Sequence, residues 1–228
     1  MGINRYKYLD LIMAAFVTVL VLSNVASSAK IVDLHISLFN VPLAFDGGTI
    51  LFPISYIFGD ILTEVYGFKA SRRVIWAGFA ALALSCVVFF LLKMLPGEAS
   101  WQEYAGDAAY EAILGGLCSG ALWLASLSAY LAGEFSNSML LSRLKVLMKG
   151  RLLFVRTIGS TLVGELLDSL IFIGIATLLG VFDKSLFLSL VITNYILKCA
   201  FEIVMTPATY AAAAALKRKE GIDTFDKW

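Results

Sequence analysis

Residues 56–67 read YIFGDILTEVYG, and this stretch places two carboxylates, Asp60 and Glu64, inside a run of otherwise apolar residues. An ionisable group at the centre of a membrane-spanning helix costs about 2.5–3.5 kcal/mol on insertion scales. The whole chain is apolar: 60% of its 228 residues are hydrophobic, 15% are charged, and its mean hydropathy is +0.85. Such a composition indicates a membrane protein, so the two carboxylates need an explanation within a membrane.

Six apolar segments are long enough to cross a bilayer, whose hydrocarbon core of about 30 Å takes roughly 20 helical residues. They cover approximately residues 8–29, 49–66, 74–95, 112–133, 157–179 and 186–216. The last is long enough to tilt, or to break near Pro207. The segments between them are too short to bury a core of their own. The sequence therefore predicts an all-α integral membrane protein, with residues 1–228 forming one domain of six transmembrane helices.

Lys and Arg are distributed unequally between the two sides of these segments. Three lie on one side, Lys30, Lys93 and Lys184, and Lys198 lies within the sixth segment. The other fourteen lie on the side of both termini: Arg5, Lys7, Lys69, Arg72, Arg73, Arg143, Lys145, Lys149, Arg151, Arg156, Lys217, Arg218, Lys219 and Lys227. Because loops rich in Lys and Arg stay in the cytoplasm, we expect a multi-pass protein with both termini cytoplasmic. The net charge of +1 gives no reason to expect nucleic-acid binding.

The three cysteines, Cys86, Cys118 and Cys199, all lie within apolar segments, at a spacing that matches no metal site or redox motif. We expect them to pack as small apolar residues. The only histidine, His35, lies in an outer loop. The sequence therefore predicts neither a bound metal ion nor a cofactor.

Six ionisable side chains lie within the expected helices, in three pairs spaced three or four residues apart: Asp60 and Glu64, Glu165 and Asp168, and Lys198 and Glu202. Residues at that spacing share one helix face. If all six faced lipid unpaired, the penalty would be roughly 15–20 kcal/mol, so we expect them to face the protein interior or a wet cavity. The two acidic pairs repel unless a proton, a cation or a hydrogen-bonding ligand separates them. We therefore predict a substrate site lined by these residues.

Structural interpretations of the same charges remain open. Lys198 and Glu202 can pair with each other along one helix, and Glu64 lies close enough in sequence to Lys69, Arg72 and Arg73 for an interfacial salt bridge. Asn24, among the serines of the first segment, either joins two helices by hydrogen bonds or lines a polar path.

The second segment opens with DGGTILFPISY, in which Gly47, Gly48 and Pro53 interrupt helix formation. Irregular backbone at membrane depth is tolerated where it is buried in protein or lines a cavity. Aromatic residues, Tyr56 and Phe58 among them, accompany the carboxylates of this segment. The second segment is therefore expected to border the substrate site.

The two halves of the chain contain similar short stretches. LSNVASSAK at residues 22–30 resembles FSNSMLLSR at 135–143, and GDILTE at 59–64 resembles GELLDS at 164–169. Because three crossings are an odd number, a 3+3 repeat would be inverted, as in many secondary transporters. The charged segment 142–156 is expected to form a solvated turn or an amphipathic helix on the membrane surface.

Several separated motifs, in this order, resemble one bacterial family. They are FPISYIFGDILTEVYG from Phe52, then Arg72 and Arg73, SNS from Ser136, RTIGSTLVGELLDSLIFI from Arg156, and KCAFEIVMTP from Lys198. They resemble the queuosine precursor transporters, also called the vitamin uptake transporter family, over nearly the whole chain. The resemblance implies a six-helix inner-membrane importer of deazaguanine bases, the cyano or aminomethyl precursors of a modified tRNA nucleoside. The family has no ATPase domain and this sequence has no GxxxxGK[ST] phosphate loop, which implies secondary active or facilitated transport.

A deazaguanine presents a ring N–H and an exocyclic amine beside a carbonyl, and one carboxylate can accept both donors. With such a substrate, we expect Asp60, Glu165 or Asp168 to receive this edge. Aromatic stacking on the ring is worth about 1–3 kcal/mol per base, and the candidates are Tyr56, Phe58 and Tyr195. The expected partners are the deazaguanine base and the lipid bilayer. The preferred precursor, coupling to protons and the formation of a homodimer stay open.

Two alternatives stay open beside an autonomous importer. A substrate-capture subunit of an energy-coupling-factor importer also has six spans and cytoplasmic termini, but needs separate ATPase subunits. An intramembrane aspartyl protease uses two aspartates that share a proton, and Asp60 and Asp168 lie on different helices. Its Gly-x-Gly-Asp motif reads IFGD at residues 57–60 here and lacks the first glycine. We therefore predict a transporter and not an enzyme.

Overall fold

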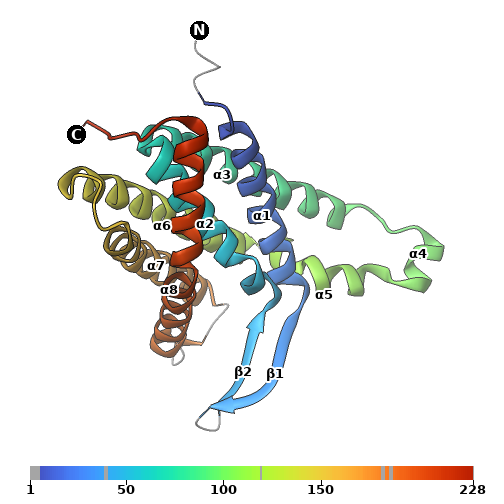
Figure 1. Ribbon diagram of the computed structural model, residues 1–228. Coiled ribbons are helices and arrows are strands. Elements are labelled where there is room, and N and C mark those ends of the chain that lie inside the picture. Colours follow the sequence, from blue (N-terminus) through green and yellow to red (C-terminus); the bar gives the residue numbers. More distant parts are fainter. Residues whose placement is uncertain (1–5, 39–40, 119, 181–182, 185–186, 228) are drawn as a thin grey trace.

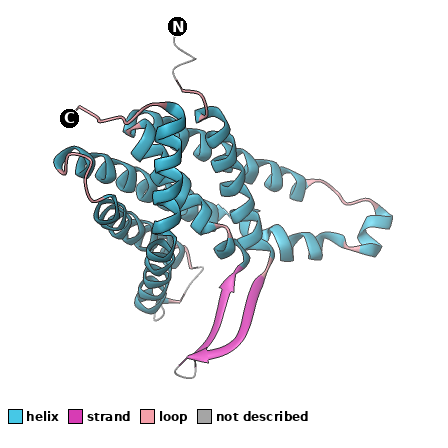
Figure 2. Cartoon of the chain, in the orientation of Figure 1, coloured by secondary structure: helices cyan, strands magenta, loops and turns pink. Residues whose placement is uncertain are grey.

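The computed structural model describes residues 6–38, 41–118, 120–180, 183–184 and 187–227, which are mostly helical (Figures 1 and 2). In chain order the elements are α1 (Leu9–Ala29), β1 (Ile31–Leu38), β2 (Val41–Asp46), η1 (Gly47–Ile50), α2 (Phe52–Ile61), η2 (Leu62–Tyr66), α3 (Phe68–Met94), α4 (Ala99–Tyr104), α5 (Gly106–Cys118), α6 (Gly120–Leu147), α7 (Leu153–Leu178) and α8 (Phe187–Glu220). Both termini lie at one end of the helical bundle, and the β1–β2 hairpin extends from the other (Figure 1).

Within the described residues, five helical stretches are long and apolar enough to cross a membrane. They are Leu9–Ala29, Phe68–Met94, Gly106–Leu147, Leu153–Leu178 and Leu190–Glu220. Each overlaps one of the six expected segments. The second expected segment is not among these five helical stretches. Its first residues belong to η1 and a turn, and the helical part that follows consists of α2, with ten residues, and η2, with five. No break occurs at Pro207, which lies inside a continuous α8.

The hairpin is the one departure from an all-α chain among the described residues. Strands β1 and β2 pair antiparallel, with Ile31 opposite Asp46 and Leu38 opposite Val41. The sequence of β1, IVDLHISL, alternates apolar and polar residues from Val32 onward. This period of two favours a strand over a helix. The all-α prediction is therefore wrong for this segment, which lies between the first two expected helices.

Glycines allow α6 and α7 to pack closely. A Cβ on Gly133 would lie 2.9 Å from the Asp168 Cβ, and a Cβ on Gly164 would lie 2.8 Å from the Asn137 Cβ. Small residues at such positions let helix backbones approach within a membrane. This contact places Asn137 of α6 and Asp168 of α7 at one helix–helix junction.

The charged segment 142–156 is a solvated turn only in its middle, where Lys149, Arg151 and Leu152 are exposed. Helix α6 continues to Leu147 and α7 begins at Leu153. The turn between them is tight, with positive φ at Lys149, Gly150 and Leu152. Lys145 and Arg156, on either side of this turn, are buried, with exposed fractions of 2% and 0%. Their charges therefore need partners inside the protein.

Candidate functional site

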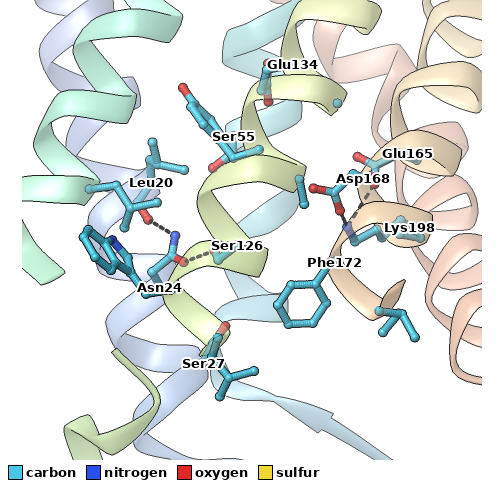
Figure 3. Close-up of a pocket in the computed structure, with 18 of the residues that line it drawn as sticks. Leu20, Asn24, Ser27, Ser55, Ser126, Glu134, Glu165, Asp168, Phe172 and Lys198 are labelled. Carbon is cyan, nitrogen blue, oxygen red and sulfur yellow. Dashed lines mark hydrogen bonds and ion pairs between the residues drawn. The ribbon is translucent and has the colours of Figure 1, made fainter. Parts of the chain in front are cut away.

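A cavity of about 540 Å³ lies between α1, α2, α3, α5, α6, α7 and α8 (Figure 3). Its size falls within the range of about 300–1,000 Å³ that is typical of small-molecule sites. Its polar lining consists of Asn24, Ser27, Ser28, Ser55, Ser126, Glu134, Asn137, Thr161, Glu165, Asp168, Ser169 and Lys198. Its aromatic lining consists of Trp123, Tyr130 and Phe172. The cavity therefore offers both a polar and a stacking surface.

An ion-paired group from α7 and α8 forms one wall of the cavity (Figure 3). The Lys198 Nζ atom lies 3.1 Å from the Glu165 Oε2 atom and also donates a hydrogen bond to Asp168. The ammonium group is thus the cation that separates two carboxylates one helical turn apart. Lys198 pairs across helices and not with Glu202 on its own helix. Its side chain is 20% exposed, so it keeps contact with the cavity.

Two further carboxyl groups approach each other from α2 and α6. The Asp60 Oδ1 atom accepts a hydrogen bond of 3.1 Å from the Asn137 Nδ2 atom, while Asp60 Oδ2 has no partner among the described residues. Glu134 lies one turn before Asn137 and lines the cavity. Its close approach to α2 depends on Gly59, where a Cβ would lie 3.2 Å from Glu134 Oε2. Glu134 Oε2 is buried and likewise lacks a partner within the described chain.

Glu202 completes the acidic group from α8. It is 1% exposed and faces Asp60 and Glu165. Neither of its carboxylate oxygens accepts a hydrogen bond from the part of the chain that the structure describes. The nearby Thr206 hydroxyl instead donates to the Glu202 backbone carbonyl, at 2.8 Å. Together, five residues form the inner acid cluster: Asp60, Glu134, Glu165, Asp168 and Glu202.

Glu64 belongs to a different group. Its two oxygens accept bonds of 2.5 and 3.2 Å from the Arg156 guanidinium, and Glu64 Oε1 lies 2.5 Å from Lys217 Nζ. Lys145 lies 3.7 Å from the same oxygen. These cations replace Lys69, Arg72 and Arg73, the partners considered from sequence. Glu64 is therefore the centre of a salt-bridge network near both termini, because Lys217 lies close to Glu220, which accepts a hydrogen bond from the Lys7 backbone.

Asp223, from the tail after α8, completes this network. It ion-pairs with Lys145 and lies 2.8 Å from Lys217. Partial burial raises the pKa of the Asp223 carboxyl, but hydrogen bonds from Lys145 and Lys217 outweigh burial and lower the pKa below its ordinary value. The terminal ion cluster, defined as Glu64, Lys145, Arg156, Lys217 and Asp223, thus pairs three cations with two carboxylates.

The remaining predicted site residues are placed differently. Asn24 lines the cavity, where its Nδ2 atom donates to the Leu20 carbonyl at 2.8 Å and the Ser126 hydroxyl donates to its Oδ1 atom at 3.4 Å (Figure 3). Phe58 lines a separate, shallow pocket between α1 and the end of α8. Tyr195 lies beside Cys199 and is not among the lining residues. The side chain of Tyr56 lies outside the part that the structure describes.

Sequence reasoning missed Glu134, which directly follows the fourth expected segment. It also did not list Asn137, although SNS at residues 136–138 was noted as similar to the stretch around Asn24. Helix α6 continues past Gly133, so Glu134 and Asn137 share a face that points into the protein. The signal that could have found Glu134 is its position three residues before an asparagine that the internal similarity pairs with Asn24.

Comparison with known proteins matches residues 46–212 to a family described as "Putative vitamin uptake transporter". The chain belongs to this family. A relative from Bacillus subtilis (strain 168), named "Probable queuosine precursor transporter", is 29% identical over 175 residues, which are 76% of this chain and 73% of the relative. No solved structure matches the chain. The vitamin uptake transporter family consists of membrane transporters and not enzymes, and the whole inner acid cluster lies within the matched residues.

Proposed function

We propose that the protein imports queuosine precursors, the cyano- or aminomethyl-deazaguanine bases, across a bacterial inner membrane. The name of the Bacillus subtilis relative supports this substrate class. The observation that carries the proposal is the cavity itself, which Glu134 lines beside the Glu165, Asp168 and Lys198 group. Both the acceptors and the donor that a guanine-like edge needs are therefore present in one cavity.

Recognition of the base follows from hydrogen-bond chemistry. A cavity carboxylate, with Glu134 as the first candidate, accepts from the ring N–H and the exocyclic amine, and the Lys198 ammonium donates to the neighbouring carbonyl. Trp123 or Phe172 provides the stacking surface, in place of Tyr56, Phe58 and Tyr195. An aminomethyl precursor also brings a positive charge, which the cavity-lining acids Glu134, Glu165 and Asp168 would stabilise.

The proposed import also requires a direction across the membrane. In this proposal α2 and η2 form part of a sixth crossing, the two halves are a 3+3 inverted repeat, and both termini are cytoplasmic. Fourteen of the eighteen Lys and Arg residues are expected on the side of both termini. Loops rich in Lys and Arg stay in the cytoplasm, which supports this orientation. Ser28, at the end of α1 next to the hairpin, lines the cavity. The cavity would then extend toward the outer face, while the terminal ion cluster closes the cytoplasmic face.

The test is uptake of labelled cyano- and aminomethyl-deazaguanine by bacteria that neither synthesise these bases nor have their own importer. We expect the native protein to restore uptake and Asp168→Asn to reduce it at least tenfold. Glu103→Gln, which changes an exposed acid on α4, is the matched control and should not change uptake. Immunoblotting of membranes checks that each variant is inserted.

The result of this assay also decides between an autonomous importer and a capture subunit. Uptake in a host without energy-coupling-factor subunits supports the autonomous importer. Uptake that appears only when those ATPase subunits are added would assign the protein to the capture class. No uptake of either base by well-expressed native protein would overturn the proposed substrate.

A further inference from the structure

We propose that Asp60 and Glu202 form a proton-binding site whose proton is carried inward together with the substrate. This inference rests on the import function proposed above and adds its energy source. In this scheme, a proton from water on the outer side binds to one carboxylate of the pair. It is released to water on the cytoplasmic side when the substrate is released.

The contacts of Asp60 and Glu202 are incomplete in a way that a proton would correct. Both side chains are 1% exposed, and three of their four carboxylate oxygens have no hydrogen-bond partner among the described residues. Ionised carboxylates only accept hydrogen bonds, so neither acid can satisfy the other while both are charged. A single proton turns one of them into a donor toward its neighbour. Two close carboxyl groups that cannot both ionise commonly share a proton in this way.

The charges that surround the pair also favour protonation. Glu134 faces it from α6, Glu165 faces it from α7, and Asp168 and Lys198 lie beyond them. Five acids and one lysine leave four negative charges uncompensated in this part of the described chain. The salt bridges of the terminal ion cluster go to Glu64 and Asp223 and do not reach Asp60 or Glu202. Because a neutral cyano base brings no positive charge, protons are needed to neutralise the cluster.

A proton fits this site better than a metal ion. Within the described residues, no group of three His, Cys, Asp or Glu side chains is placed to hold a metal ion. A divalent cation such as Ca²⁺ takes about six to eight oxygen ligands, with carboxylates prominent among them. A proton requires only the pair and the Asn137 amide that already donates to Asp60.

The pair is separated from the substrate but connected to it. Asp60 and Glu202 are not among the residues that line the cavity, whereas Glu134 and Asn137 are. Asn137 bonds to Asp60 directly, and Glu134 lies near enough to interact electrostatically with it. Substrate contacts and proton binding are therefore carried by different residues of one network, so substitutions at the pair should uncouple transport without abolishing substrate exchange.

The experiment uses purified protein in liposomes and labelled cyano-deazaguanine, with two measurements on each variant. Exchange of internal for external base involves no net proton movement, whereas accumulation against a gradient is driven by an imposed pH difference. We expect native protein to do both. Asp60→Asn and Glu202→Gln should retain exchange within about twofold and lose at least tenfold in accumulation, while Glu103→Gln behaves as native.

The outcomes separate this inference from the proposed function. If native protein exchanges the base but does not accumulate it under a pH gradient, or accumulates it only under a sodium gradient, the proton site is overturned and the substrate assignment stays intact. Full accumulation by Glu202→Gln would have the same meaning. A measurement without substrate covers the case in which no exchange occurs. Infrared spectroscopy of the native protein at neutral pH should show the C=O stretch of a protonated carboxyl group that is lost in Glu202→Gln, and absence of that band in the native protein contradicts the proposal.

Discussion

The inner acid cluster and the terminal ion cluster each include one carboxylate of YIFGDILTEVYG, Asp60 and Glu64 respectively, but only Glu64 is paired with cations among the described residues. Glu64 contacts three cations, while Asp60, four residues earlier, has one hydrogen bond from an amide. Between them the chain enters the π-helical turn η2, whose five residues are all buried. A π turn changes the rotation of the residues that follow it, and such turns are frequent at functional sites. Two acids one turn apart are thus directed to different partners.

This comparison separates two uses of buried charge. In the terminal ion cluster each carboxylate is paired, which is what a structural role requires. In the inner acid cluster the carboxylates outnumber the cations, which leaves capacity to bind a proton or a ligand. Equal burial, 1% exposure at both Glu64 and Glu202, makes these two residues a direct test of the difference.

The largest effect is expected from the same substitution at these two positions. Glu64→Gln leaves Arg156 without a carboxylate partner among the described residues and leaves Lys145 and Lys217 with Asp223 alone. Breaking a buried ion pair in this way costs about 3–5 kcal/mol. Glu202→Gln removes a charge that has no cation in contact, so stability should change by less than about 1 kcal/mol or increase. Thermal unfolding of the two purified variants in one detergent measures both. Equal losses would show that the inner cluster is as structural as the terminal one.

The sequence predicted the long helices well, because the length of an apolar run decides whether a helix can span a bilayer. It did not predict the partners of the charges. Segment 142–156 has the composition of a solvated turn, and only the tertiary contact with Glu64 makes Arg156 and Lys145 buried residues. Likewise, the pairing of Lys198 with α7 instead of Glu202 depends on how two helices pack, which periodicity along one helix does not report.

A second prediction concerns the glycines that hold the inner cluster together. Gly164→Ala would place a Cβ 2.8 Å from the Asn137 Cβ and 3.0 Å from the Gly133 carbonyl oxygen, so that α6 and α7 must separate. Overpacking of this kind costs about 1–3 kcal/mol. Gly59→Ala, at the corresponding position of the similar stretch, meets only the Glu134 carboxylate at 3.2 Å, which can move. Unfolding measurements should therefore show a smaller loss for Gly59→Ala, and the reverse order would contradict this packing.

A third prediction distinguishes the two clusters by function. Lys198→Met removes the cation between Glu165 and Asp168 and the proposed donor to the substrate carbonyl. We expect at least tenfold weaker precursor binding, which corresponds to about 1.4 kcal/mol. Because the side chain borders the cavity, water can partly solvate the two acids and limit the loss of stability. Binding to purified protein gives the measurement, with Lys93→Met, at an exposed ion pair, as the control. Unchanged affinity in Lys198→Met would remove Lys198 from the substrate site.

The smallest effect is expected at the exposed edge of the terminal ion cluster. The Asp223 side chain is 45% exposed, so Asp223→Asn should cost less than about 1 kcal/mol at neutral pH, as solvent-screened pairs do. The Asp223 pKa is lowered in the folded protein, so its contribution is complete above the unfolded value of about 3.9 and disappears as the pH falls through the lower folded value. The stability difference between native protein and Asp223→Asn should therefore be constant near neutrality and vanish only in strong acid. Asp107→Asn, at an exposed acid on α5, serves as control. A difference that vanishes above pH 5 would mean that Lys145 and Lys217 do not hold this carboxylate in its charged form, and that Glu64 alone neutralises them.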